Sequence, residues 1–192
     1  MPRVLRLIFH RTETVLGAVI ILLAIVFSLA SPYFFTLSNA TDLVEAYAVT
    51  TILASGVFVV LVSGGIDISF AAVASVTQYI AAIVATELGF GPVPAIGLAC
   101  LIGFLLGSIN ALLTYHLRVV SIIVTIATAS IFYALLIYVT GGSEIYNLPA
   151  WWTERIVLLR IESESGDFAR ITMPMVVMTV VVLATYFLMT RT

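Results

Sequence analysis

The sequence predicts an all-α membrane protein, a polytopic bundle of about six transmembrane helices whose N-terminus lies in the cytoplasm. Hydrophobic residues make up 62% of the 192 residues and charged residues only 9%, whereas a soluble domain is roughly 45–50% apolar and about 25% charged. The mean hydropathy is +1.21. Eight arginines and ten acidic residues are too few to cover a soluble protein of this size, so apolar side chains must face lipid.

The rare charges leave six uncharged runs of 19 to 30 residues, and a helix that crosses a bilayer needs about 20 mainly apolar residues. Each run therefore holds one predicted helix. Transmembrane barrel strands would instead alternate in character over about ten residues, and these continuous apolar runs do not. The expected helices cover residues 14–31, 45–63, 69–86, 94–114, 121–140 and 171–190.

The first helix is expected to be retained, because its apolar part exceeds the roughly 7–15 residues of a signal peptide and no A-x-A cleavage site follows. Cytoplasmic segments are enriched in arginine and lysine. With the N-terminus inside, five arginines fall on the inner side and three on the outer side. The outer three share a polar extracytoplasmic loop at 141–170. Trp151 and Trp152 of this loop either lie on the membrane surface or pack beneath the loop.

Small residues recur at every fourth position of the fourth expected helix and form a stripe along its length. Such stripes let helix backbones approach closely, whereas a lipid-facing surface gains nothing from them. We therefore expect this helix to be buried in the bundle. The stripe consists of Ala95, Ala99, Gly103, Gly107 and Ala111.

Polar side chains inside the spans allow two interpretations. Gln78 lies in the third expected helix and Asn110 in the fourth, while Ser121, Thr125 and Thr128 share one face of the fifth. These residues either line a hydrated pathway for a hydroxylated solute or form hydrogen bonds between helices.

The sequence carries no set of catalytic or metal-binding residues. His10 and His116 are isolated, and neither an H-E-x-x-H nor a G-x-S-x-G motif occurs. Lysine is absent, which excludes a P-loop, so any ATP hydrolysis must come from another chain. The net charge of −2 argues against nucleic-acid binding, and the single Cys100 cannot form an intrachain disulfide. We predict no enzyme, no cofactor and no metal site.

The segment Gly64-Gly65-Ile66-Asp67-Ile68-Ser69 joins the second and third expected helices. Two glycines permit a tight turn, and Asp67 is suited to cap the next helix by accepting hydrogen bonds from its first amides. Alternatively, Asp67 acts as a charged element of a gate or solute pathway. The first role tolerates asparagine, whereas the second requires the carboxylate.

These residues resemble a known family. Gly64–Ser69 resembles the GGIDLS motif of the permease subunits of ribose-type, simple-sugar ABC importers. Gly107–Ala111 followed by Arg118–Thr125 is similar to a second block of that family, which the pair Gly141-Gly142 closes. The resemblance covers nearly the whole chain. It implies a transmembrane permease component for a sugar or sugar-like solute in the bacterial inner membrane, with ATP hydrolysed by a separate subunit.

The resemblance also implies partners: an ATP-binding cassette subunit, a periplasmic or extracellular solute-binding protein and a second permease subunit. It implies a single transmembrane permease domain over residues 1–192, the N-terminal part of a longer permease, and no cofactor. Ala71, Ala111 and Ala127 stand where the family usually has glycine, so ribose itself is not implied. The candidate pathway or gating residues are Gly64, Gly65, Asp67, Ser69, Gln78, Asn110, Thr125 and Thr128.

The alternative from a different class is half of an ion-coupled secondary transporter. Such a protein needs ionisable groups within its spans to couple ion and solute movement. Apart from Asp67, at an expected helix boundary, the predicted spans lack them.

Overall fold

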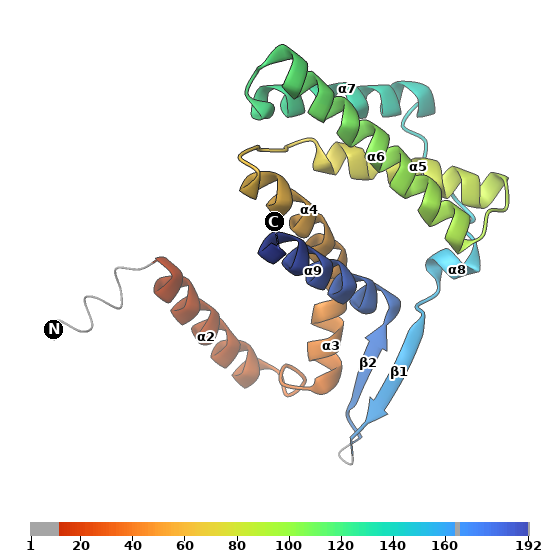
Figure 1. Ribbon diagram of the computed structural model, residues 1–192. Helices are drawn as coiled ribbons and strands as arrows, with labels where there is room; N and C mark the ends of the chain where they lie inside the picture. Colours follow the sequence, from red (N-terminus) through yellow and green to blue (C-terminus); the bar gives the residue numbers. More distant parts are fainter. Residues whose placement is uncertain (1–11, 164–165, 192) are drawn as a thin grey trace, which may run out of the picture. The chain divides into compact units, whose positions relative to one another are not determined.

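The computed structural model describes residues 12–163 and 166–191, and it confirms an all-α polytopic membrane fold (Figure 1). A short two-stranded antiparallel sheet is the only sheet in these residues. The described elements are α2 (Thr12–Ala30), α3 (Leu37–Ala46), α4 (Ala48–Val62), α5 (Phe70–Glu87), α6 (Pro92–Leu117), α7 (Ser121–Thr140), α8 (Ala150–Thr153), β1 (Val157–Glu162), β2 (Phe168–Thr172) and α9 (Met173–Arg191).

Four of the described helices, α5, α6, α7 and α9, are long and apolar enough to cross a membrane. The helix expected over 45–63 is instead the pair α3 and α4, which is bent by 44° and makes a fifth candidate span if taken together. No proline or glycine lies between Leu37 and Ser55, so nothing in the local sequence signals this break. The apolar part of α2, Thr14–Ala30, is too short to count as a candidate span by itself.

The described chain divides into two compact units, and the first comprises residues 12–47 and 157–175. It contains α2, α3 and the β1–β2 hairpin. The expected loop at 141–170 thus contains a hairpin that was not predicted from the sequence, and β2 delays the start of the last helix to Met173. The strands pair in register from Glu162 opposite Phe168 to Val157 opposite Thr172, with one irregularity between Val157 and Leu159.

The hairpin holds α3 at two places. The Asp167 carboxylate, just before β2, accepts hydrogen bonds from the Leu37 amide and, at 3.2 Å, from the Ser38 amide. These amides belong to the first turn of α3 and have no partner within the helix. One turn further along, the Arg170 guanidinium donates to both carboxylate oxygens of Asp42, at 2.8 and 2.9 Å. The hairpin therefore supplies both a cap and an ion pair to α3.

Acidification is expected to weaken the cap on α3. The hydrogen bond from the Leu37 amide, with those from Ser38 and Phe168, holds the pKa of Asp167 below its ordinary value of 3.8. A carboxyl whose pKa is lowered by folding stabilises the folded state above its ordinary pKa and loses this contribution as pH falls through the lowered value. The cap is thus complete at neutral pH and is lost only as pH falls below the ordinary value of 3.8.

Hydrogen exchange of the Leu37 and Ser38 amides, corrected for intrinsic exchange rates, measures this effect. In the wild-type chain, protection of these two amides should fall as the Asp167 carboxylate is protonated. In the Asp167→Asn variant, their protection should be lower at neutral pH and should not change over the same acidic range. The same acid-dependent loss of protection in the Asp167→Asn variant would contradict the assignment to Asp167.

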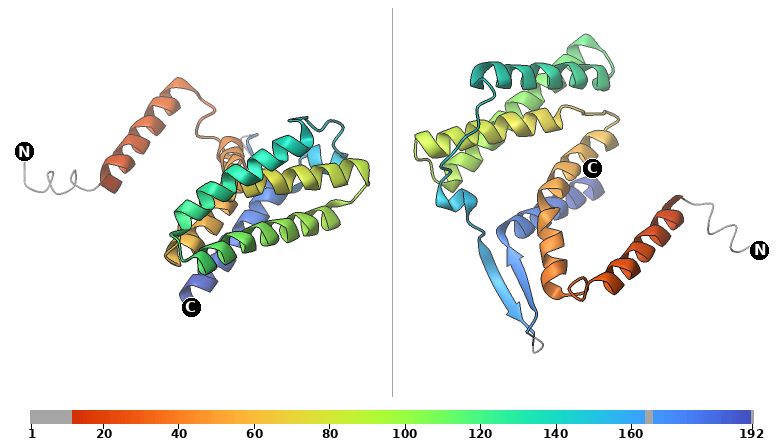
Figure 2. Two further views of the ribbon diagram at one scale, coloured as in Figure 1. Left: turned by 90° about the horizontal axis from the view of Figure 1, so that it is seen from above. Right: turned by 180° about the vertical axis from the view of Figure 1, so that it is seen from behind.

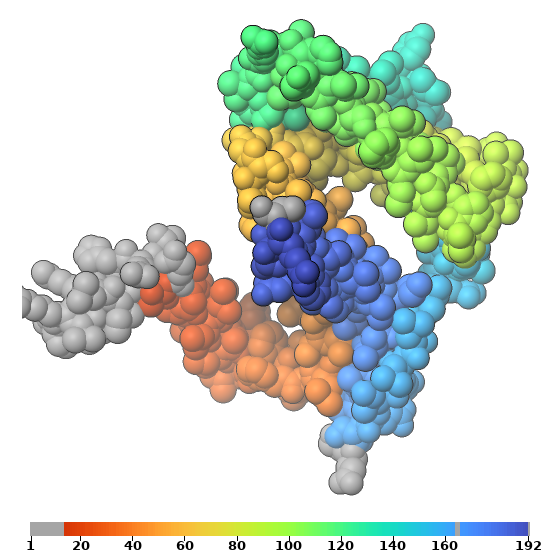
Figure 3. All heavy atoms as spheres, in the orientation of Figure 1, coloured from red at the N-terminus to blue at the C-terminus, as the bar shows by residue number. Residues whose placement is uncertain are grey.

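The second unit comprises residues 48–156 and 176–191 and contains the α5–α6–α7 bundle. The three helices lie side by side (Figure 2), with α5 packed against both α6 and α7. Their contacts are built largely from small side chains, which let the backbones approach. The space-filling view shows α6 and α7 in contact as well (Figure 3). The buried apolar residues of this unit are Ala48, Ala81, Ala82, Ala85, Ala95, Val124 and Phe132.

The small-residue stripe of α6 meets α5 over only part of its length. Ala95 is buried, and a Cβ atom added at Gly103 would lie 3.7 Å from Cγ2 of Thr77 on α5. Gly107 and Ala111 are exposed. The predicted burial of the whole helix is therefore not found in this chain, because its described neighbours α5 and α7 cover one side of α6 and leave the rest uncovered.

Candidate solute-pathway site at the junction of α4 and α5

A compact reversal connects α4 to α5. The Gly64 amide donates to the Leu61 carbonyl and the Gly65 amide to the Val60 carbonyl, both at 3.0 Å, which closes the end of α4. Gly64 has φ +85°, a conformation that side chains with a Cβ atom disfavour. A Cβ atom on Gly65 would lie 3.2 Å from Val60 Cγ1 and 3.4 Å from Ser121 Oγ. The tight turn predicted from the glycine pair is thus confirmed.

Two hydroxyls of α7 bind the backbone of this reversal. Ser121 Oγ accepts a hydrogen bond from the Ile66 amide at 2.8 Å. Thr125 Oγ1 accepts one from the Ile68 amide and donates to the Ile66 carbonyl, each at 3.2 Å. Backbone groups outside a helix must find other partners when water is excluded. Here the hydroxyls of Ser121 and Thr125 on α7 supply them. This agrees with the expectation that polar side chains within the spans form hydrogen bonds to other segments.

A buried chain of polar groups extends from this reversal to α6. The hydroxyl of Ser69, which is fully buried, donates to Asp67 Oδ1 at 2.7 Å and accepts from Asn110 Nδ2 at 2.6 Å. Asp67 Oδ1 also accepts from the Ser69 amide at 2.7 Å. Asn110 Oδ1 is buried and has no hydrogen-bond partner among the described residues. One carboxylate, one hydroxyl and one amide thus connect the reversal and the start of α5 to α6.

The expectation that Asp67 is the N-cap of α5 is wrong in detail. The N-cap residue is Ser69, and it makes no side-chain cap hydrogen bond. Asp67 lies two residues earlier and binds the amide and hydroxyl of Ser69 itself. Ser69 already has αR dihedral angles, so the Asp67 carboxylate precedes the helical conformation and binds the N-cap residue rather than the amides that follow it.

These residues border a cavity of about 410 Å³ on one side of the reversal. Its lining includes four of the eight candidate residues, Gly65, Asp67, Asn110 and Thr125, and the two exposed stripe residues Gly107 and Ala111. Gly64 and Ser69 are adjacent in the chain. The other lining residues are Val59, Val60, Ser63, Ile66, Thr114, Tyr115 and Ser121.

The remaining two candidates lie elsewhere. Thr128 is buried on α7, where its hydroxyl donates to the Val124 carbonyl of the same helix at 3.0 Å, and it is not among the residues that line this cavity. Gln78 lies on α5 and lines a different cavity. Ser121 was expected to share a helical face with Thr125 and Thr128, and the structure places its hydroxyl on the Ile66 amide and in the lining of the cavity beside the reversal.

The chemistry of the cavity is hydrogen bonding. Its polar groups can donate to and accept from hydroxyl groups, and the described residues contain no cluster of His, Cys, Asp or Glu that could hold a metal ion. The arrangement suits a passage or a moving junction between helices, because its polar groups join three helices through side chains rather than through continuous backbone.

Comparison with known proteins gives a consistent result. The profile of the family described as "Branched-chain amino acid transport system / permease component" matches residues 39–192. The autoinducer 2 import system permease protein LsrC of Yersinia pseudotuberculosis serotype O:3 (strain YPIII) is 32% identical over 143 residues, which are 73% of this chain and 40% of that protein. LsrC of Yersinia pestis (strain Pestoides F) is 31% identical over the same shares. The chain thus spans about two fifths of these relatives. No solved structure matches the chain significantly.

Proposed function

Because the chain belongs to the family of branched-chain amino acid transport system permease components, we propose that it is the transmembrane permease component of an ABC importer for a sugar or sugar-like solute. The observation that carries the proposal is the junction at 63–69, whose backbone is bound by Ser121 and Thr125 and whose Asp67–Ser69 pair reaches Asn110. A change in the angle between α4 and α5 would be transmitted directly to α6 and α7 through these bonds.

The same proposal includes the partners. A separate ATP-binding cassette subunit hydrolyses ATP, a solute-binding protein delivers the solute, and a second permease subunit, identical or related, completes the pathway. The complex lies in the bacterial inner membrane. The permease itself forms no covalent bond with the solute, and its contribution is to open the pathway to one side of the membrane at a time.

The favoured solute is a hydroxylated one. The matched LsrC proteins carry a name that refers to autoinducer 2 import, and the lining of the cavity beside the reversal includes hydroxyl, amide and carboxylate groups as well as apolar side chains. One observation also fits the ion-coupled alternative. The side-chain oxygen of Asn110 has no hydrogen-bond partner among the described residues and lines the same cavity as Asp67, and such oxygens bind cations.

Uptake into right-side-out membrane vesicles distinguishes the two mechanisms. Vesicles from cells with and without the gene for this chain are loaded with ATP and given radiolabelled pentoses and hexoses together with the solute-binding protein. We expect gene-dependent uptake that stops when vanadate is enclosed with the ATP and continues when ionophores dissipate the ion gradients. Uptake that ionophores abolish and vanadate does not affect would establish the ion-coupled alternative. Uptake that is the same with and without the gene would refute transport.

A further inference from the structure

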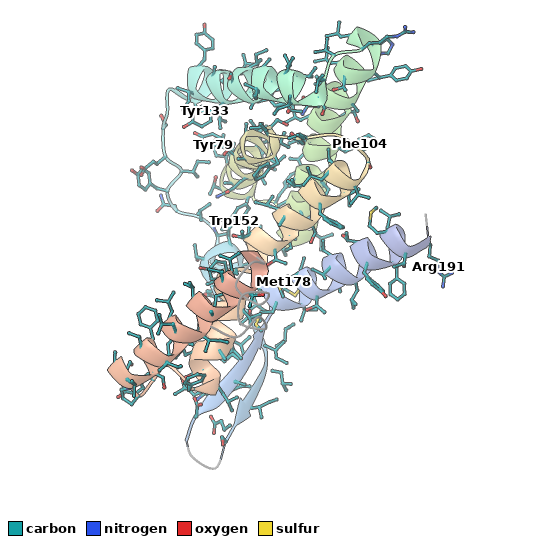
Figure 4. The ribbon with its side chains drawn as sticks, turned by 90° about the vertical axis from the view of Figure 1, so that its left-hand side faces the viewer. Tyr79, Phe104, Tyr133, Trp152, Met178 and Arg191 are labelled. Atoms are coloured by element: carbon teal, nitrogen blue, oxygen red, sulfur yellow. The ribbon has the colours of Figure 1, made fainter. Side chains whose placement is uncertain are left out.

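The outer edge of the β1–β2 hairpin is open for pairing with another strand. β1 pairs with β2 on one side, and no other strand in residues 12–163 and 166–191 pairs with it. All six residues of β1 are exposed, and Figure 4 shows the hairpin with side chains projecting from its strands. A two-stranded sheet is marginally stable by itself, and an open edge strand is a template for strand addition. β1 contains neither the proline nor the lysine that commonly protects such an edge.

Hydrogen bonds near the turn of the hairpin determine which backbone groups of β1 face its open edge. The Ser163 amide donates to the Asp167 carbonyl at 2.7 Å, so the backbone of residue 163 faces β2. In an antiparallel pair, successive residues alternate between facing the partner strand and facing away from it. The backbone groups of Ile161 therefore face β2 as well, and those of Glu162 face the open edge.

The other edge of the sheet gives the same alternation. Arg170 of β2 is opposite Arg160 of β1. The Arg170 amide points away from β1, because it donates to Thr41 Oγ1 of α3 at 3.4 Å. Its cross-strand neighbour Arg160 must then also direct its backbone groups away from the hairpin. The open edge thus presents the amides and carbonyls of two residues of opposite charge, Arg160 and Glu162.

Charge selects one register for the pairing of this edge with a second copy of itself. If Arg160 lies opposite Arg160 of the second copy, or Glu162 opposite Glu162, like charges meet, which is destabilising. A larger shift, with Arg160 opposite Leu158, pairs neither charge. With Arg160 opposite Glu162, antiparallel symmetry repeats the favourable pair, so that each copy neutralises both charges of the other.

The same register also extends the apolar face of the hairpin. Side chains alternate between the two faces of a strand, so Leu159 and Ile161 of β1 share a face with Ala169 and Ile171 of β2. Leu159 and Ile161 are 50% and 54% exposed. With Arg160 opposite Glu162, Ile161 of one copy lies directly opposite Ile161 of the other, and the two apolar faces become one.

We propose that β1 pairs antiparallel with β1 of a second copy of this chain, with Arg160 opposite Glu162, and that the two hairpins form one four-stranded sheet. Each Arg160–Glu162 pair then exchanges two backbone hydrogen bonds. The proposal rests on one part of the proposed function, the second permease subunit. It deepens that part, because it names the contact surface and requires an identical chain. So small a contact is effective between chains that already share a membrane, since confinement raises their effective concentration.

The symmetry of this pairing also orients the sheet. Two copies inserted in the same direction are related by an axis along the membrane normal, and antiparallel neighbours in a sheet are related by an axis perpendicular to the sheet. The four-stranded sheet would therefore lie parallel to the membrane surface. Its joined apolar face can then rest on the lipid, as the apolar face of an amphipathic segment does.

Disulfide cross-linking in the membranes of expressing cells tests the register, in a Cys100→Ser background that removes the free thiol. Ile161→Cys places two thiols at the symmetry axis, where the Cα atoms of the pair lie about 4.5 Å apart and a disulfide bridges roughly 4.4–6.8 Å. Leu159→Cys is the matched control, similarly exposed on the same face, but its two copies lie four residues apart along the strands, about 13 Å. We expect severalfold more covalent dimer from Ile161→Cys than from Leu159→Cys, relative to the inserted chain.

Charge exchange separates pairing between copies from pairing within one chain, where Arg160 also binds Glu162 at 3.0 Å. Added to Ile161→Cys, either Arg160→Glu or Glu162→Arg places like charges opposite each other and should lower the amount of dimer about threefold or more. When the two variants carry different tags and are expressed together, mixed dimers should form as well as those of the parent. Charges across the strands are then again opposite, although those within each chain are alike.

The outcomes separate this inference from the transport function. As much dimer from Leu159→Cys as from Ile161→Cys, dimer from neither, or mixed dimers no more abundant than those of each charge variant alone would overturn the inference, even where vanadate-sensitive uptake supports transport. Dimer from Ile161→Cys that is restored in the mixed pair supports the inference. The same result in a chain whose gene does not affect vesicle uptake supports the strand pairing and refutes the transport function alone.

Discussion

Replacing Asp67 with alanine is expected to lower the free energy of unfolding of the chain by about 2–3 kcal/mol, because it removes the acceptor of two donors on Ser69. Ser69 is fully buried, so neither its amide nor its hydroxyl gains water in exchange. The loss extends to Asn110, whose amide is held by the same hydroxyl. Asp67→Asn keeps the acceptor Oδ1 and is expected to cost less than about 1 kcal/mol.

Thermal unfolding in detergent, followed by size-exclusion chromatography, measures both changes. Ser63→Ala is the matched control, since its hydroxyl donates only to the Val59 carbonyl of its own helix and should shift stability by less than about 0.5 kcal/mol. An alanine variant as stable as the Ser63 control would show that Asp67 does not hold the junction.

Uptake normalised to the amount of inserted protein then separates the structural role of Asp67 from a role for its charge. Near-normal uptake by Asp67→Asn is expected if the side chain serves as an acceptor for Ser69. If Asp67→Asn inserts and unfolds like the parent but does not transport, the carboxylate itself takes part in the transport cycle and the structural account is incomplete.

Replacing Arg170 with alanine is expected to release the hairpin from α3, at a cost of about 2 kcal/mol. Nη2 of the guanidinium donates to both carboxylate oxygens of Asp42 and the group lies 4.9 Å from the ring centroid of Phe168, while the side chains of Arg170 and Asp42 are 24% and 44% exposed. Charge-assisted hydrogen bonds of this kind are stronger than neutral hydrogen bonds, although partial exposure keeps the value below the roughly 3–5 kcal/mol of a fully buried pair.

The matched control is Arg160→Ala on the neighbouring strand. Arg160 also lies over the Phe168 ring, at 4.6 Å, but its ion pair with Glu162 is mostly exposed, with side chains 56% and 67% accessible. Exposed pairs contribute about 0–1 kcal/mol. Hydrogen exchange of the α3 amides should increase in the Arg170 variant and remain near the parent value in the Arg160 variant. Equal exchange in the two variants would mean that the Asp42 pair does not fix the hairpin.

The sequence was most informative where physical constraints act on single segments. Uncharged runs of bilayer length identified the apolar helices, and the pair Gly64-Gly65 identified the turn, because only glycine adopts φ +85° without strain. The sequence named Gly65, Asp67, Asn110 and Thr125 as candidates. It did not show that these four residues line one cavity, as they do in the structure. Their roles in a pathway remain predictions.

The sequence was least informative where structure depends on contacts between distant segments. The bend between α3 and α4 has no local breaker, and the contacts from Asp167 and Arg170 to α3 span about 130 residues. The hairpin was missed because a two-stranded sheet gives only two short segments of strand character within a charged loop. Gln78 was a candidate from the sequence, and only the structure shows that it lines a different cavity, with Glu144 and Trp152, from the one beside Asp67.

The attachment of the 63–69 reversal to α7 has a consequence for how the chain is assembled during synthesis. The Ile66 amide is bound by a hydroxyl 55 residues further along the chain, so this amide has no side-chain partner from α7 when α4 and α5 leave the ribosome. At about 5–20 residues per second, the wait is roughly 3–11 s. During that interval the reversal must stay in contact with water or with the insertion machinery. The insertion of α7 is therefore the event that supplies the partners of the reversal between α4 and α5, and nascent chains arrested before Ser121 should expose this turn to aqueous reagents.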